Sequence, residues 1–338
     1  MIKLRSYDIL QEVSRRQGAI IFKARHKPSG EVPAFMDDEE PVVCAKCIDM
    51  ESYALSKAQR GSVCTEAREL LRLSHANVAQ YHKLYVSDTH LVYLTDYAES
   101  GTLNHLMHTL RNSGEKMDED LVWHIFLQLC MGLRELHDAA VVHRNLTARN
   151  VLLLRETMFD HTVFKYRCKI TDIRLPTIQR HCGHVALPSS SFRYLAPELV
   201  KNQKHDHKVD SWALGCVLYE LLTLTHAFHS SAAIAAAEYA PIPEGRAPEL
   251  AGLVAQLLVA DPTKRISVSE ILQMPLLHER CAGMPNAAFL ESESRLAAET
   301  SRACAADASS PLREGTRVWF KSASDGRWRQ GEISEQIG

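Results

Sequence analysis

The sequence predicts an α+β fold with two lobes, a small β-rich N-terminal lobe and a larger helical C-terminal lobe. Short runs rich in β-branched and apolar residues, such as Val42–Ala45 and Leu91–Leu94, are broken by turn residues in the first hundred positions. Between Leu121 and Leu136, apolar residues instead recur at helical spacing. An almost continuous apolar stretch from Val209 to Leu224, around Trp212, predicts another helix of the second lobe.

Composition changes along the chain predict four segments. They are an N-terminal lobe with a hinge at 1–98, a helical lobe at 99–280, an Ala- and Ser-rich linker or marginal helix at 281–313, and an aromatic β-hairpin at 314–338. The hairpin resembles the opening strands of Tudor-like or SH3-like barrels. Two interpretations stay open: a barrel module cut short, or an isolated hairpin docked on a lobe.

Composition limits the partners and the compartment. The net charge of -2 gives no global field for nucleic acid or an anionic membrane, and no run approaches 18 apolar residues. Nine scattered cysteines suit a reducing compartment. We therefore expect no nucleic acid and no membrane as partners, and a cytoplasmic location, with nuclear or cytoskeletal association left open.

Two cysteine-containing clusters do not predict metal sites. Cys44 and Cys47 have C-x-x-C spacing, but they lie in a strand-like run whose alternation would send the thiols to opposite faces. The stretch from His181 to His184 lacks a second cluster that would complete four ligands. We expect the two thiols to be small buried hydrophobes.

The motif between His143 and Asn150 reads H-R-N-L-T-A-R-N, where a protein kinase carries H-R-D-L-x-x-x-N. Other kinase landmarks occur in order and at kinase spacings: a V-x-x-K run at Lys46, an A-P-E motif at Glu198 and a D-x-W-x-x-G motif at Asp210. Residues from Tyr7 to His278 therefore resemble a complete protein kinase domain.

This resemblance implies a site for ATP and Mg²⁺. Lys46 would pair the α- and β-phosphates, and Glu66, in a helix expected over Glu66–Leu73, would position that lysine. Thr95 matches the gatekeeper, and Asp96 and Ala98 belong to the hinge that bonds adenine. Asn150 and Asp172 match the residues that hold Mg²⁺ through hard oxygen atoms.

The resemblance also implies structural roles. Glu198 would pair with a buried arginine, Arg265, and Asp210 would brace the catalytic loop that contains His143. Arg144 would either pair a phosphate on the segment from Asp172 to Glu198, where Thr177 and Ser189–Ser191 are candidate acceptors, or simply pack the loop. We also expect a helix that starts at Asp261–Thr263 and ends near Pro275.

Within the superfamily, the stretch from Trp212 to Phe228 looks like the NIMA-related serine/threonine kinases. The catalytic loop departs from them, because Thr147 stands where those kinases have lysine. It is similar instead to the pseudokinase receptor of the epidermal growth factor receptor family, which we interpret as convergence.

Three departures affect the chemistry. Asn145 replaces the aspartate that would accept the substrate proton, and an amide is not a useful base. The glycine positions of G-x-G-x-x-G are filled by Ser14, Arg16 and Ala19. Arg15 or Arg16 could place a guanidinium over the phosphates, but we expect both side chains to point to solvent on the hairpin tip. D-F-G reads Asp172-Ile173-Arg174, which predicts a less mobile activation segment.

The sequence therefore predicts a catalytically impaired pseudokinase that binds ATP and Mg²⁺ and acts as a scaffold or allosteric partner of another protein. A second hypothesis is a weakly active serine/threonine kinase that transfers the γ-phosphate to protein hydroxyls, with Asn145 orienting the hydroxyl. A third is an adaptor that uses the C-terminal hairpin.

Overall fold

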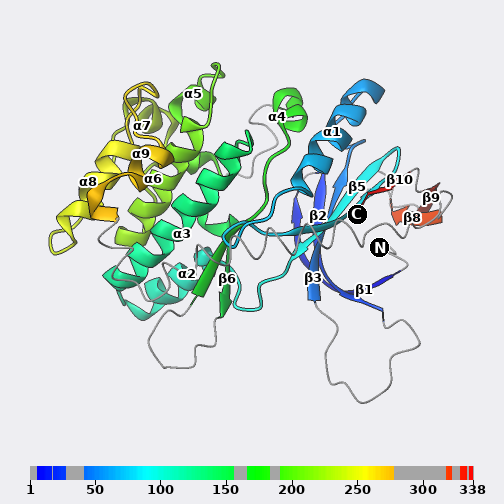
Figure 1. Cartoon of the computed structure of the whole chain (residues 1–338), viewed down its shortest axis with the longest axis horizontal. Helices are drawn as coiled ribbons and strands as arrows, with labels where there is room; N and C mark the ends of the chain where they lie inside the picture. The colour runs from blue at the N-terminus through cyan, green and yellow to red at the C-terminus, as the bar shows by residue number, and fades with distance from the viewer. Residues whose placement is uncertain are drawn as a thin grey trace, which may run out of the picture.

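The computed structural model describes residues 6–16, 18–27, 42–155, 166–182 and 191–277, together with three strands near the C-terminus. It has the two lobes that the sequence predicts, with the β-sheet of the N-lobe beside a larger helical C-lobe (Figure 1). None of the helices in these stretches is both long and apolar enough to cross a lipid bilayer.

The N-lobe is built on an antiparallel sheet in the order β1-β2-β3-β5-β4, with a sixth strand, β10, on the free edge of β4. The strands are β1 Tyr7–Arg16, β2 Ala19–His26, β3 Val42–Asp49, β4 Tyr81–Val86, β5 His90–Asp96 and β10 Glu335–Ile337. One face buries a small apolar cluster that includes Phe22, Ala45 and Leu94. The central strands β3 and β5 carry residues of the interlobe cleft.

Helix α1, Lys57–Leu70, is the helix of the N-lobe. It starts well before Glu66, the first residue of the predicted helix, because Ser56 caps it. The Ser56 hydroxyl accepts a hydrogen bond from the Gln59 N–H, and the Gln59 side chain accepts one from the Ser56 N–H. This capping box satisfies two backbone donors, so the sequence signal for the helix start lies at Ser56.

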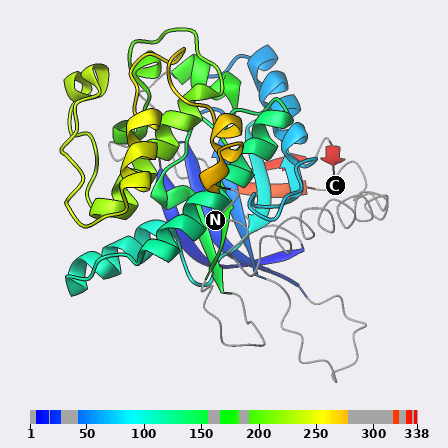
Figure 2. The ribbon, with the colours of Figure 1, turned by 60° about the vertical axis from the view of Figure 1, so that its left-hand side comes forward.

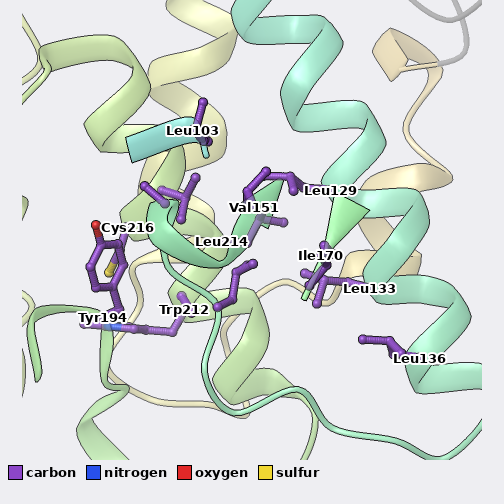
Figure 3. Close-up of a cluster of buried hydrophobic side chains, with 14 of the residues drawn as sticks. Leu103, Leu129, Leu133, Leu136, Val151, Ile170, Tyr194, Trp212, Leu214 and Cys216 are labelled. Carbon is purple, nitrogen blue, oxygen red and sulfur yellow. The ribbon is translucent and has the colours of Figure 1, made fainter. Parts of the chain in front are cut away.

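The C-lobe helices surround the buried helix α6, Lys208–Thr223 (Figure 1). The others are α2 Leu103–Ser113, α3 Glu119–Asp138, α4 Pro176–Cys182, α5 Pro197–Val200, α7 Ser231–Ala236, α8 Pro248–Leu257 and α9 Val268–Leu272. A short hairpin of β6 Val151–Arg155 and β7 Tyr166–Ile170 lies below the hinge. Figure 3 shows the core, where α3 contributes Leu129 and Leu133 and α6 contributes Trp212.

The approach of α6 to α8 depends on Gly215. A Cβ at this position would lie 2.8 Å from the Cβ of Leu257 and 2.8 Å from a methyl carbon of Leu258. Real Cβ atoms do not approach so closely, so any larger residue would push the two helices apart. The D-x-W-x-x-G motif thus ends on a glycine for a packing reason.

The helix expected to start at Asp261 does not start there. The Asp261 carboxylate accepts hydrogen bonds from the Thr263 N–H and hydroxyl, which closes a turn instead. Helix α9 begins after Ser267, whose hydroxyl accepts from the Glu270 N–H in a capping box. The prediction of a helix in this region was correct, but its start was wrong because Asp261 bonds its own turn.

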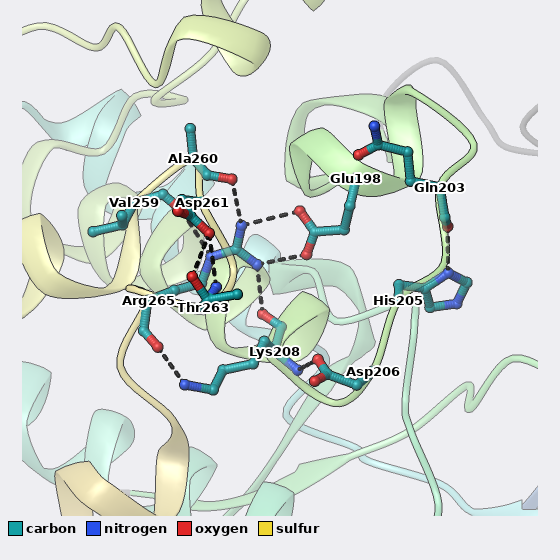
Figure 4. Close-up of polar contacts among 10 residues, drawn as sticks. All are labelled: Glu198, Gln203, His205, Asp206, Lys208, Val259, Ala260, Asp261, Thr263 and Arg265. Carbon is teal, nitrogen blue, oxygen red and sulfur yellow. Dashed lines mark hydrogen bonds and ion pairs between the residues drawn. The ribbon is translucent and has the colours of Figure 1, made fainter.

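Arg265 and Glu198 form the buried ion pair that the sequence predicts (Figure 4). The two guanidinium nitrogens lie 2.7 and 3.0 Å from the two carboxylate oxygens, and the residues are 1% and 3% exposed. Three backbone carbonyls accept the remaining donors of Arg265, at Val259, Ala260 and Lys208. A buried charge is tolerated when paired and hydrogen-bonded, and here both conditions hold.

The aromatic segment forms the predicted hairpin from β8, Arg317–Lys321, and β9, Trp328–Glu332. The Ser324–Gly326 turn and the linker at 281–313 lie outside the described residues. Strand β10 then pairs antiparallel with β4, with Gln336 opposite Tyr85. The C-terminal strands lie on the N-lobe side of the molecule in both views (Figures 1 and 2).

Candidate nucleotide-binding site

A cavity of about 380 Å³ opens between the two lobes, in the size range of small-molecule sites. Val13 of β1 and Ile21 of β2 line it from the N-lobe, and Leu152 of β6 lines it from the C-lobe. A flat aromatic ring could lie between these apolar side chains. Six further lining residues are ones that the sequence predicts for ATP, namely Lys46, Thr95, Asp96, Ala98, Asn150 and Asp172.

The hinge residue Asp96 contributes to this cavity, but its side chain is already occupied. Its carboxylate accepts hydrogen bonds from Lys169 Nζ at 2.6 Å, from His82 Nε2 at 2.9 Å and from the Gln80 N–H at 3.0 Å. Burial by itself would raise the pKa of Asp96, but these donors outweigh it and lower the pKa to about 2. The backbone of the hinge, rather than this carboxylate, is what remains for a ligand.

The two cysteines of β3 point to opposite faces of the sheet, as predicted. Cys44 lies opposite the gatekeeper Thr95 and lines the cavity. Cys47 packs into the apolar cluster on the other face. Burial raises the pKa of the Cys44 thiol to about 11, so it stays protonated and behaves as a small apolar group.

Lys46 forms an ion pair with Asp172, through the carboxylate oxygen Oδ1. Both side chains are largely buried, at 18% and 10% exposed. The other oxygen, Oδ2, accepts a hydrogen bond from the Asn145 amide nitrogen at 3.0 Å, and the same nitrogen donates to the Asp172 carbonyl, also at 3.0 Å. Each oxygen of this carboxylate therefore already has a donor.

Asn145 thus does more than remove a base. An aspartate could not donate either of these hydrogen bonds, and its charge would lie about 3 Å from the Asp172 carboxylate. Asn150 completes the arrangement by donating to the Asn145 carbonyl at 2.6 Å. The Asn145 amide therefore links the catalytic loop to Asp172, the residue expected to hold Mg²⁺.

Glu66 does not pair with Lys46, which corrects the role expected for it. Its carboxylate accepts three hydrogen bonds from Thr177 of α4, two of them bifurcated from the backbone N–H at 3.0 and 3.1 Å and one from the hydroxyl at 2.7 Å. Arg180 lies 3.5 Å from the same carboxylate. Helix α4 lies against α1 (Figure 1), and Lys46 turns to Asp172 instead.

The first hairpin does not form an open phosphate-binding loop. Strands β1 and β2 stay paired as far as Arg16 and Ala19, which leaves a turn of only two residues. Gly18 adopts a positive φ of 70° in this turn, and a Cβ there would lie 2.6 Å from the Tyr53 ring. The remaining glycine therefore serves the turn and its packing rather than approach to a phosphate.

Arg15 does not reach over the cavity. Its guanidinium binds Glu12 on the exposed surface, with distances of 2.6 and 2.9 Å. The expectation that Arg15 points to solvent fits this geometry. The side chain of Arg16 lies outside the described residues.

The catalytic loop keeps its brace. The buried carboxylate of Asp210 accepts the His143 and Arg144 backbone N–H groups, each at 2.8 Å, and pairs with His137 at 2.9 Å. Burial opposes ionisation of Asp210, but these donors still lower its pKa. The bonds hold Arg144 at a φ of 60°, which is unfavourable for a side chain larger than glycine.

The guanidinium of Arg144 donates to the Val142 carbonyl at 2.9 Å, as a loop-packing residue would. The candidate acceptor Thr177 is 5% exposed and its hydroxyl is bound to Glu66, while Ser191 is 8% exposed. Ser189 and Ser190 lie outside the described residues. The alternative role of Arg144, pairing a phosphate, stays a prediction.

Three site residues were not found from the sequence. Arg149 lines the cavity and is exposed, Lys169 neutralises Asp96, and Arg180 joins Thr177 at Glu66. Arg149 stands one residue before Asn150, so its place beside a predicted site residue could have revealed it. Lys169 and Arg180 carry no comparable sequence signal, because their partners are distant in the chain.

The residues predicted to hold Mg²⁺ come together, but the cation does not fit the arrangement. It would have to displace an ammonium group from one oxygen of Asp172 and an amide donor from the other. In the described part of the chain, no cluster of three His, Cys, Asp or Glu side chains could hold a metal ion. The ring of His181 lies 3.1 Å from the Gln59 amide; its neighbours at 183–184 are not described.

The fold, the cleft and the ordered landmarks define a protein kinase domain, and the family model for that domain matches residues 28–277. The chain therefore belongs to the protein kinase family. Among curated proteins it is similar to serine/threonine-protein kinase Nek8 of Danio rerio, with 31% identity over 240 residues that cover 69% of this chain and 33% of that protein.

Other relatives belong to the same NIMA-related group. Nek1 of Mus musculus is 29% identical over 232 residues, covering 67% of this chain and 18% of that protein. Nek10 of Homo sapiens is 28% identical over 284 residues, covering 80% of this chain and 23% of that protein. The domain is thus similar to NIMA-related kinases, and the chain spans about a third or less of the length of these relatives.

Proposed function

We propose that this chain is a catalytically impaired kinase that binds ATP in the interlobe cleft and acts by presenting a conformation to a protein partner. The observation that carries the proposal is the pair of hydrogen bonds from Asn145 to Asp172. The residue at the place of the catalytic base is used as a donor, so it supplies neither a negative charge nor a proton acceptor for a substrate hydroxyl.

The expected loss is large without being absolute. General-base catalysis contributes roughly 10² to 10⁴-fold in rate. Phosphoryl transfer depends more on positioning and electrostatics, and here Lys46 contacts Asp172 while Glu66 is held by Thr177. These contacts support impaired transfer together with a retained cavity for nucleotide.

Radiolabelled phosphate transfer from ATP to a mixture of serine- and threonine-containing proteins tests the proposal. Wild type and Lys46→Met should both give background incorporation, and Asn145→Asp should give little recovery because Glu66 and the first hairpin remain altered. If wild type transfers phosphate and Lys46→Met does not, the chain is a slow serine/threonine kinase, and the proposal of impaired catalysis is wrong.

A further inference from the structure

The charges of the cleft suggest how a nucleotide could bind without its usual cation. Four charged side chains line the cavity, two of each sign: Lys46 and Arg149 are cationic, and Asp96 and Asp172 are anionic. Asp96 is already neutralised by Lys169 from outside the cavity lining. Lys46 is paired with Asp172 in the same way, so the surplus positive charge rests on Arg149, and it suits an anionic ligand.

The negative charge of Asp172 would repel a triphosphate, and in a protein kinase a divalent cation between them offsets this repulsion. Here Lys46 contacts its Oδ1 and the Asn145 amide contacts its Oδ2. The carboxylate is neutralised and hydrogen-bonded within the protein, so its repulsion of a phosphate is reduced. A cation would have to break these bonds before it could join Asp172 to the ligand.

Arg149 offers a replacement for the missing cation. Its side chain is exposed at the cavity, one residue before Asn150, and it has no hydrogen-bond or ion-pair partner among the described residues. A guanidinium can bind phosphate oxygens in a bidentate manner and stays charged at any physiological pH. It also compensates for the tight first hairpin, whose backbone is paired rather than open to phosphate.

We propose that the cleft binds free ATP, with Arg149 taking the place of a divalent cation at the phosphates. This inference rests on the proposed function, because it specifies the ionic form of the nucleotide that the same site accepts. Asn145 is the positioning residue, because its amide donates a hydrogen bond to the Asp172 oxygen Oδ2 that a metal ion would otherwise bind.

Isothermal titration calorimetry of the full chain with ATP, in excess EDTA and in excess MgCl₂, tests the inference. Wild type should show dissociation constants that agree within about threefold in the two conditions, since no bound cation contributes. Asn145→Asp places two carboxylates about 3 Å apart, so its affinity in EDTA should fall by about tenfold or more and recover in MgCl₂.

Arg149→Ala supplies the second arm. It should weaken ATP binding in EDTA by about tenfold and leave adenosine binding unchanged, because adenosine lacks phosphates. Arg72→Ala is the matched control, since this exposed arginine pairs with Glu69 on α1 and does not line the cavity.

The outcomes separate the two proposals. ATP binding by wild type only in MgCl₂ overturns cation-free binding but leaves a nucleotide-binding kinase domain intact. Equal loss of ATP and adenosine affinity in Arg149→Ala also overturns the inference, because the arginine would then act through the fold. Absence of ATP binding in every condition overturns the proposed nucleotide function and this inference with it.

Discussion

The helical lobe and the interlobe cleft both retain kinase landmarks, but they differ in how those landmarks are paired. In the C-lobe, Glu198 binds Arg265 and Asp210 holds the His143 backbone, as the family pattern implies. In the cleft, Lys46 binds Asp172, while Glu66 binds Thr177. The residue types survive in both regions, and only one region keeps the partners expected from them.

This difference has a physical basis. The C-lobe pairs are buried in a helical core, where an unpaired charge would be costly. The cleft is partly open, and Lys46 and Glu66 each have another partner of suitable charge or polarity there. Substitution at Asn145 adds a donor that favours the alternative arrangement.

The largest expected effect comes from breaking the fixed region. Arg265→Met leaves the Glu198 carboxylate buried without its partner and should lower the free energy of unfolding by about 3–5 kcal/mol. Urea denaturation followed by fluorescence would measure it. The control is Lys264→Met, because Lys264 is the exposed neighbour. A cost below about 1 kcal/mol would show that the C-lobe pair is no more fixed than the cleft pairs.

Replacing both partners sharpens the same test. In Glu198→Gln with Arg265→Met, no charge remains buried, so part of the lost stability should return. A double variant as unstable as Arg265→Met would mean that packing of the guanidinium, 5.0 Å above the Trp212 ring, accounts for the cost.

An intermediate effect is expected at His75, in the segment between α1 and β4. Burial, followed by the positive charges of Arg134 and Lys169, lowers the pKa of His75 from 6.5 to about 4. Below pH 6.5 the His75 imidazole binds a proton in the unfolded chain, whereas in the folded protein it stays neutral down to about pH 4. The contribution of the neutral His75 to the free energy of unfolding is therefore complete above pH 6.5, and it falls by up to about 3 kcal/mol as the pH drops to 4.

His75→Asn should remove this pH dependence, since an amide does not titrate and its oxygen can still accept the Asn77 N–H that His75 Nδ1 accepts at 3.0 Å. Urea denaturation at several pH values measures the free energy of unfolding of both proteins. On acidification this free energy should fall more for wild type than for the variant. His105→Asn, at an exposed position on α2, is the control. Parallel curves for wild type and His75→Asn would contradict the assignment.

The smallest effect is expected in the cleft, at the contact between α1 and α4. Thr177→Val removes the hydroxyl bond to Glu66 but keeps the backbone bonds, so it should cost only about 1 kcal/mol. Hydrogen exchange should become faster in α4. Thr65→Val is the matched control, because that hydroxyl bonds the Gly61 carbonyl within α1. Unchanged exchange in α4 would show that Glu66 does not hold it.

Sequence reasoning succeeded where the chemistry of a motif is local or where burial leaves no alternative. The order of strands and helices and the opposite faces of Cys44 and Cys47 follow from spacing and alternation, and the resemblance to protein kinases implied the Glu198–Arg265 pair. It missed the start of α9, because Asp261 bonds to Thr263 in its own turn. It missed Arg149 because this residue occupies a position that the H-R-D-L-x-x-x-N motif leaves unspecified.

The sequence by itself determined the protein kinase fold, the loss of the catalytic carboxylate at Asn145 and the loss of the phosphate-loop glycines, because these are statements about residue identity and order. Only the tertiary structure decided that Lys46 pairs with Asp172, that Thr177 takes Glu66 and that the Asn145 amide donates to Asp172. Charged and polar groups in an open cleft have several partners within reach, and the relative placement of α1, α4 and the catalytic loop selects among them.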